Sequence, residues 1–138
     1  MDTKSKFEVT DYYHLLALHR AVMLMKFDSD PIDMNLVFSP YIAEMSKNIL
    51  KTLIDMELEM GKKDVLKNWN GFKAANTTPS AERWSIVVKN ACTITSWTTI
   101  DMEKKKELVQ VLFSPFELDD ALLNQLIEEV DEKVVSEA

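Results

Sequence analysis

The residues of this chain that could do chemistry are few, and its two histidines and two arginines stand out among them. His14 and His19 are five residues apart in an expected helix, so they point about 140° away from one another and cannot chelate one metal. We expect no metal site, with one histidine partly buried and the other solvated. Arg20 and Arg83 could hold a carboxylate or phosphate, although an internal ion pair is the commoner use of such residues. If an apolar ligand with an anionic head binds between helices, its available anchors are His14, His19, Arg20 and Arg83.

Motifs of the familiar enzyme classes are missing from the sequence. It has no glycine-rich phosphate loop, no HExxH, no paired cysteine ligands and no GxSxG. Carboxylates are numerous, and Glu57 and Glu59 come nearest to the apolar setting that catalytic carboxylates have. We therefore expect a protein that is not an enzyme.

Composition bounds the class of protein. At 138 residues the chain is expected to form one domain, residues 1–138. A net charge of −7 argues against nucleic-acid binding, because that affinity depends on basic side chains. No apolar run approaches the roughly twenty residues that cross a membrane, and the N-terminus shows no secretory signal. With Cys92 as the single cysteine, these features predict a cytoplasmic protein without membrane insertion.

The central helix is the clearest structural element, over residues 39–61. Ser39 is a suitable cap, Pro40 suits the first helical position, and Gly61 suits the left-handed exit. Apolar side chains recur between them at three- and four-residue spacing, which predicts one apolar face. That face is typical of a core helix, and the sharper hypothesis is that it lines an apolar ligand site. Its members are Ile42, Met45, Ile49, Leu53, Met56 and Met60.

The four prolines each follow a residue that can cap a helix, which predicts four helix starts, at Pro31, Pro40, Pro79 and Pro115. At the last start, Ser114 and Glu117 have the spacing of a capping box.

The other elements are also helical by pattern. Residues 11–27 carry apolar side chains over more than half of the circumference, which predicts a helix packed on several sides. Short helices are expected over 31–38 and 62–69, with the main loop from Gly71 through the NTTPS run. Residues 79–97 are β-branched, but no partner strand is evident, so a helix is favoured. Helices over 98–113 and 115–135 complete an all-α bundle of about six helices.

The last helix has an apolar face broad enough to pack on its own domain and on a second chain. The expected dimer contact consists of Leu123, Ile127 and Val130.

Three stretches carry a resemblance to a known family. They are FEVTDYYHLLALHR near the start, SPYIAEMSKNIL in the middle and VLFSPFELDDALLNQLIEEVDEK at the end. With these, nearly the whole chain resembles the small sporulation-inhibitory sensor-domain proteins of spore-forming Gram-positive bacteria. Those proteins are similar to the sensor domain of a sporulation histidine kinase and to the non-haem globin domains of stressosome sensors.

The resemblance implies a globin-like fold that forms a homodimer and holds a fatty-acid-like ligand in an apolar tunnel. Absence of haem is supported independently, because no histidine follows His19 and a globin needs a proximal histidine later in the fold. Cys92 is no substitute, since no basic residue nearby would hold its thiolate. The expected tunnel lining, which could equally be plain core, is Met45, Ile49, Leu53, Met56, Trp84, Val88 and Leu112.

The resemblance also implies a function. We expect a non-catalytic regulator in signal transduction that inhibits sporulation, either by capturing the activating ligand of a related sensor histidine kinase or by pairing with that kinase. The alternative is a helical, dimeric interaction module with a filled core and no ligand.

Overall fold

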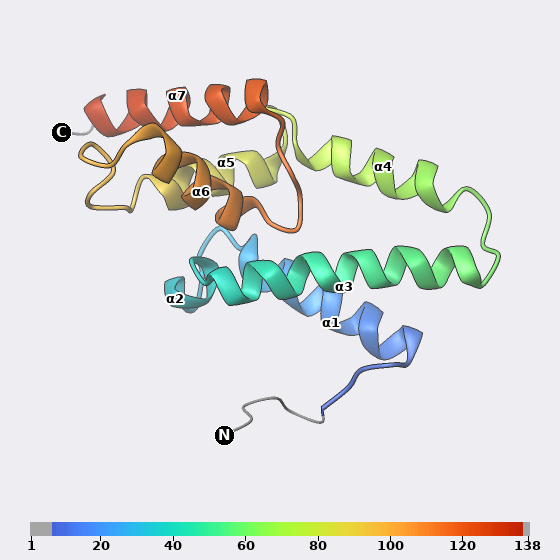
Figure 1. Ribbon diagram of the computed structural model, residues 1–138. Coiled ribbons are helices and arrows are strands. Elements are labelled where there is room, and N and C mark those ends of the chain that lie inside the picture. The colour runs from blue at the N-terminus through green and yellow to red at the C-terminus, as the bar shows by residue number, and fades with distance from the viewer. Residues whose placement is uncertain (1–6, 137–138) are drawn as a thin grey trace.

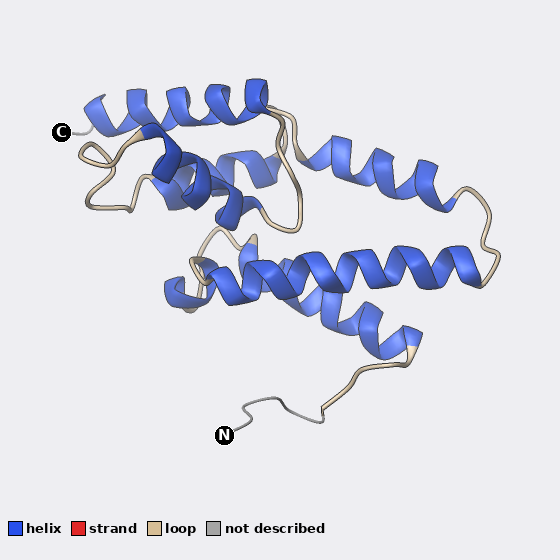
Figure 2. Cartoon of the chain, in the orientation of Figure 1, coloured by secondary structure: helices blue, strands red, loops and turns tan. Residues whose placement is uncertain are grey.

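Seven helices make up the part of the chain that the computed structural model describes, residues 7–136 (Figure 1). Loops join them, and no strand occurs among these residues (Figure 2). The all-α prediction is therefore confirmed, with one helix more than expected. The helices are α1 Tyr12–Lys26, α2 Met34–Val37, α3 Pro40–Glu59, α4 Val65–Asn76, α5 Glu82–Ala91, α6 Met102–Phe113 and α7 Asp120–Ser136.

The helices form two groups with the core between them (Figure 1). In one group α1 packs along α3, and α2 packs beside α1. In the other, α5 packs on both α6 and α7, and α6 packs on α7 and reaches α3. Helix α4 contacts α3 and α5. The largest fully buried apolar side chains include Trp84, Trp97, Phe113, Phe116 and Leu53.

Helix α3 begins and ends where the sequence predicts. The Ser39 side chain accepts a hydrogen bond of 3.2 Å from the Ile42 amide, and Pro40 is the first helical residue. Gly61 follows with φ of +72°, the left-handed conformation that favours glycine. The middle of the predicted stripe is buried, with Leu53 at 0% exposure, whereas Met45 is 49% exposed.

The other three prolines do not start helices, so that prediction is wrong. Helix α2 begins at Met34 with Asp33 as its cap, three residues after Pro31. Helix α5 begins at Glu82, and Pro79 lies in the turn before it. A capping residue followed by proline suits a turn as well as a helix start, because both positions need the same backbone angle.

The predicted capping box at Ser114 and Glu117 is also wrong. The Ser114 hydroxyl donates to the Gln110 carbonyl at the end of α6, and the Ser114–Pro115 bond is cis. The Gln110 side chain then holds the connecting loop, donating to the Phe116 carbonyl and accepting from the Leu118 amide. Helix α7 starts only at Asp120, where the Asp119 carboxylate accepts from the Leu122 amide at 2.8 Å.

Helix α4 passes through Gly71 and ends at Asn76, where the sequence predicted a loop. A glycine inside a helix costs about 1 kcal/mol. The inward contacts of Trp69 and Phe72 offset this cost, since their rings pack on each other at 5.7 Å between centroids.

The predicted helix over 79–97 is confirmed only for α5. The chain leaves the helix after Ala91, and residues 92–99 are mostly turns. The Thr93 hydroxyl donates to the Asn90 carbonyl at 2.6 Å, a local bond that competes with helix continuation. None of the described helices combines the length and apolar character needed to cross a bilayer.

Candidate functional site

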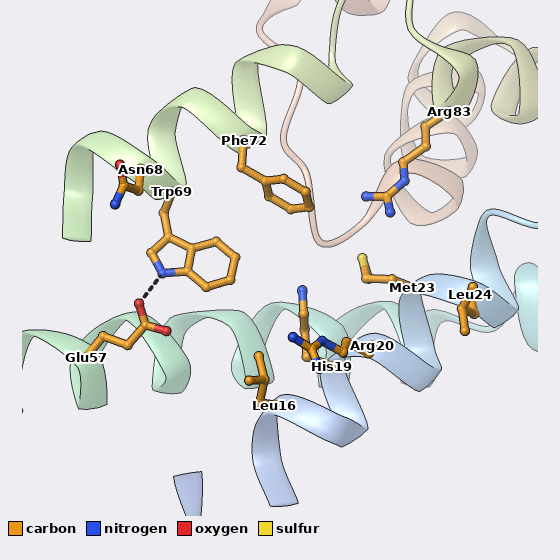
Figure 3. Close-up of a pocket in the computed structure, with 10 residues that line it drawn as sticks. All are labelled: Leu16, His19, Arg20, Met23, Leu24, Glu57, Asn68, Trp69, Phe72 and Arg83. Atoms are coloured by element: carbon orange, nitrogen blue, oxygen red, sulfur yellow. Dashed lines mark hydrogen bonds between the residues drawn. The ribbon is translucent and has the colours of Figure 1, made fainter. Parts of the chain in front are cut away.

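A cavity of about 670 Å³ lies between α1 and α4 (Figure 3). The end of α3 and the first turn of α5 contribute one lining residue each. Apolar side chains supply most of the walls, namely Leu16, Met23, Leu24, Trp69 and Phe72. The polar lining residues are His19, Arg20, Glu57, Asn68 and Arg83.

Arg83 extends from the start of α5 toward the cavity (Figure 3). Its guanidinium lies 5.0 to 5.5 Å from the ring centroids of Phe27, Phe72 and Phe116. Its Nη1 atom is buried and has no hydrogen-bond partner. Burial lowers the pKa of Arg83, and nearby Glu82 opposes that change. The guanidinium remains charged, so a cation with an unused donor faces the cavity.

His19, on α1, lines the same cavity, and only 5% of its surface is exposed. Its ring meets Trp69 edge to face at 5.8 Å between centroids, and its Nδ1 atom is buried without a partner. Burial is the main cause that lowers the pKa of His19, and the charges of Arg83 and Arg20 add to it. The imidazole is therefore neutral near pH 7, with one nitrogen left to donate or accept a hydrogen bond.

Arg20 is the exposed member of the three and lines the same cavity. The ion pairs that the sequence favoured for Arg20 and Arg83 do not occur among the described residues, whose two ion pairs involve lysines. Aromatic faces surround Arg83 in place of a carboxylate. Two unpaired arginines next to a neutral histidine give this part of the cavity a net positive charge.

Glu57 lines the cavity near Trp69 and is held by neighbouring side chains (Figure 3). Its carboxylate accepts from the Tyr12 hydroxyl at 2.6 Å and from Trp69 Nε1 at 2.9 Å. The Lys62 ammonium donates to the Tyr12 oxygen and lies 4.4 Å from the Tyr12 ring centroid. Since the chain itself satisfies this carboxylate, the unpaired polar groups are those around Arg83.

The structure places the predicted anchors unequally. His19, Arg20 and Arg83 come together at one cavity, although Arg83 is far from the others in sequence. His14 is exposed and lies outside this cavity, as expected of the solvated histidine, whereas His19 is buried where a partly buried histidine was expected.

None of the seven residues expected to line a tunnel lines this cavity. Met45 is about half exposed, and Met56 is partly buried and packs against the core. The other five are core side chains, namely Ile49, Leu53, Trp84, Val88 and Leu112. Sequence reasoning missed Trp69 and Phe72, whose three-residue spacing on an otherwise polar segment was the available signal.

The three residues expected at a dimer contact are buried within the single chain. Leu123 is 8% exposed, Ile127 1% and Val130 0%. Their face of α7 packs on α5 and α6, which leaves these side chains little surface for a second chain.

Within residues 7–136, no three or more histidine, cysteine or acidic side chains are grouped so that they could hold a metal ion. The fold and the cavity define the class as a helical protein with a cationic, largely apolar pocket. No family model, no curated protein and no solved structure matches this chain.

Proposed function

We propose that this protein is a non-catalytic binding protein whose cavity between α1 and α4 takes an apolar ligand with an anionic head, of the fatty-acid type. The observation that carries the proposal is the pair of buried, unpartnered polar atoms at the cavity, Nη1 of Arg83 and Nδ1 of His19. Leaving such groups unpaired costs about 1 to 3 kcal/mol each, and more for a charged group. A bound carboxylate would remove that cost.

Shape and lining agree with this ligand class. The volume of about 670 Å³ lies in the usual range for small-molecule sites, roughly 300 to 1,000 Å³. The walls are mainly apolar and aromatic, and two cationic side chains, Arg20 and Arg83, line the cavity together with His19. An amphiphile could therefore place its head beside Arg83 and His19 and its chain against Leu16, Met23 and Phe72.

The biological role that we propose comes from the sequence resemblance. The protein would act in the cytoplasm as a homodimeric, globin-like, non-haem sensor that inhibits sporulation. It would do so by capturing the ligand of a related sensor histidine kinase or by pairing with that kinase. The absence of any histidine after His19 supports the haem-free state.

A second candidate, a ligand-free interaction module, is favoured by one observation. Most of the stripe expected to line a tunnel is packed core. Its dimer contact would need a surface other than Leu123, Ile127 and Val130, which the chain buries itself.

The test is denaturing mass spectrometry of organic extracts from the purified protein, together with its native mass. We expect a fatty acid near one per chain, no haem and a dimeric mass. The delipidated protein should then bind oleate, and Arg83→Met should weaken that binding. An empty extract together with no oleate binding would overturn the proposal in favour of the interaction module.

A further inference from the structure

Helix α4 buries fewer of its side chains than helix α5 does, although α4 is the longer of the two. It has twelve residues, of which only Val65, at its first position, is buried. Helix α5 is two residues shorter and buries six. The main contacts of α4 are with α3 and α5, its neighbours in the chain, and it lies at the side of the molecule (Figure 1). Burial of apolar surface therefore holds α4 only weakly.

The inward face of α4 covers the cavity. Trp69 and Phe72 point from α4 toward the side chains of α1 (Figure 3). Both rings are half-buried. The Trp69 ring meets the His19 ring edge to face at 5.8 Å between centroids, and the Phe72 ring makes a tilted contact with Phe116 at 5.6 Å. Displacing α4 would remove these two rings from the cavity and open it along its length.

One carboxylate ties α4 to the two helices beneath it. Glu57 on α3 accepts from Trp69 of α4 and from Tyr12 of α1. Hydrogen bonds to an ionised acceptor are stronger than neutral ones. Glu57 is thus the polar link among α1, α3 and α4 at this point.

The connection before α4 can serve as a hinge. Gly61 has φ of +72° and Asp64 has φ of +57°, so two left-handed residues lie within four positions. Asp64 precedes the first turn of α4 without capping it through its side chain. Aspartate is one of the few non-glycine residues that adopt this conformation, so the chain can change direction at both ends of this short connection.

We propose that α4 is a lid over the cavity, that the Glu57 carboxylate latches it through Trp69 while Tyr12 holds that carboxylate in place, and that the lid swings about residues 61–64 to admit the ligand. The admission step rests on the proposed binding function. The latch itself is a property of the ligand-free chain and can be tested without a ligand.

The test is hydrogen exchange of the full, delipidated chain, resolved by segment. Glu57→Ala should speed amide exchange in α4 by about tenfold, and leave α5 and α7 unchanged. Glu129→Ala is the matched control, because Glu129 also accepts an indole N–H, from Trp84 at 2.8 Å. It should speed exchange in α5 and α7 and leave α4 unchanged.

Trp69→Phe removes the hydrogen bond that joins Glu57 to α4 and keeps an aromatic ring at this position, so it decides the case if Glu57→Ala loosens the whole chain. Faster amide exchange in α4 alone supports the latch. Two results together would overturn the latch. Amide exchange in wild-type α4 would be as slow as in α3, and neither variant would change the rate of exchange in α4.

Admission is read separately with dansyl-undecanoate in stopped-flow fluorescence. Both association and dissociation should quicken in Glu57→Ala, with the equilibrium affinity changing less than either rate. Unchanged rates beside faster α4 exchange would overturn the role of the lid in ligand entry. Failure of the wild type to bind the probe would count against the proposed function, while the exchange result would still decide the latch.

Discussion

The Arg83 guanidinium lies 5.0 Å from the ring centroid of Phe27, and no carboxylate among the described residues pairs with it. Aromatic faces stabilise a cation by about 0.5 to 2 kcal/mol, but they supply no lone pair for its N–H groups. Arg83 is thus stabilised by the rings while its Nη1 donor is left open. An anion bound in the cavity would complete its contacts.

Replacing Arg83 by methionine should separate binding from stability. The lost cation–π contacts and the relieved burial of charge oppose one another, so we expect the free energy of unfolding to change by less than about 1 kcal/mol. Affinity for oleate should fall at least about tenfold, which isothermal titration measures. The matched control is Arg20→Met, which should weaken binding less because Arg20 is exposed. Unchanged affinity in Arg83→Met would place the head group elsewhere.

Stability should fall as the pH drops below about 6.5, the ordinary pKa of histidine. Burial, then Arg83 and Arg20, lower the pKa of His19 in the folded state. The unfolded chain therefore takes up a proton at a higher pH than the folded chain, and acid favours unfolding. Urea denaturation between about pH 5 and 8 should show a shallower dependence in His19→Gln than in the wild type. The exposed His14→Gln should follow the wild type, and equal slopes in all three proteins would refute the assignment.

Lys26 should make stability rise with pH above neutrality. Its side chain is buried, its Nζ donates to the Val111 carbonyl at 2.7 Å, and burial, with the charge of Lys47, lowers its pKa to about 7. Between about pH 7 and the ordinary lysine pKa near 10.5, the unfolded chain holds a proton that the folded chain lacks.

Stability relative to Lys26→Met should therefore increase over that window by up to roughly 1.4 kcal/mol per pH unit. Chemical denaturation at several pH values measures the difference. A difference that stays constant would show that Lys26 keeps an ordinary pKa.

A tryptophan placed in the cavity should block binding without unfolding the chain. Leu16 is half-buried and lines the cavity, so Leu16→Trp fills open space. Leu53 is fully buried in the core, so Leu53→Trp should instead cost about 1 to 3 kcal/mol by overpacking. Thermal unfolding and oleate titration of both variants separate these effects. Full oleate binding by a stable Leu16→Trp protein would exclude this cavity as the site.

A charge at Ile127 should unfold the protein rather than dissociate a dimer. The side chain is 1% exposed in the core, and an unpaired buried charge is among the most damaging substitutions, at several kcal/mol. Val135→Glu is the control on the same helix, because Val135 is 71% exposed. Circular dichroism and native mass spectrometry report fold and assembly. An Ile127→Glu protein that is folded and monomeric would instead support the dimer contact predicted from the sequence.

Local signals explain which elements the sequence could predict. Helix α3 carries a cap, a first-turn proline and a terminal glycine, and each acts within a few residues of itself. The course of α4 through Gly71 depends instead on contacts of Trp69 and Phe72 with distant side chains. Pairwise signals such as a cap followed by proline are ambiguous, because turns use the same residues.

The sequence predicted the cationic and polar residues of the candidate site, but it did not predict the apolar residues that line it. His19, Arg20 and Arg83 could be selected by residue type, because the chain has only two histidines and two arginines. The apolar stripe of α3 predicts which face of the helix is buried, but it does not tell whether that face packs on other core side chains or lines a cavity. In the structure most of it packs in the core. Which apolar face borders a cavity depends on how far apart two helices lie, and α1 and α4 are far apart in the chain.

The three tryptophans lie in two environments that fluorescence can distinguish. Trp84 and Trp97 are almost completely buried and donate to Glu129 and Asp131 of α7, whereas Trp69 is half-buried at the cavity. A polar quencher such as acrylamide should therefore reach the Trp69 emission first in the native state. The unlabelled chain can thus report events at its pocket and the integrity of its interior as two components of one emission spectrum.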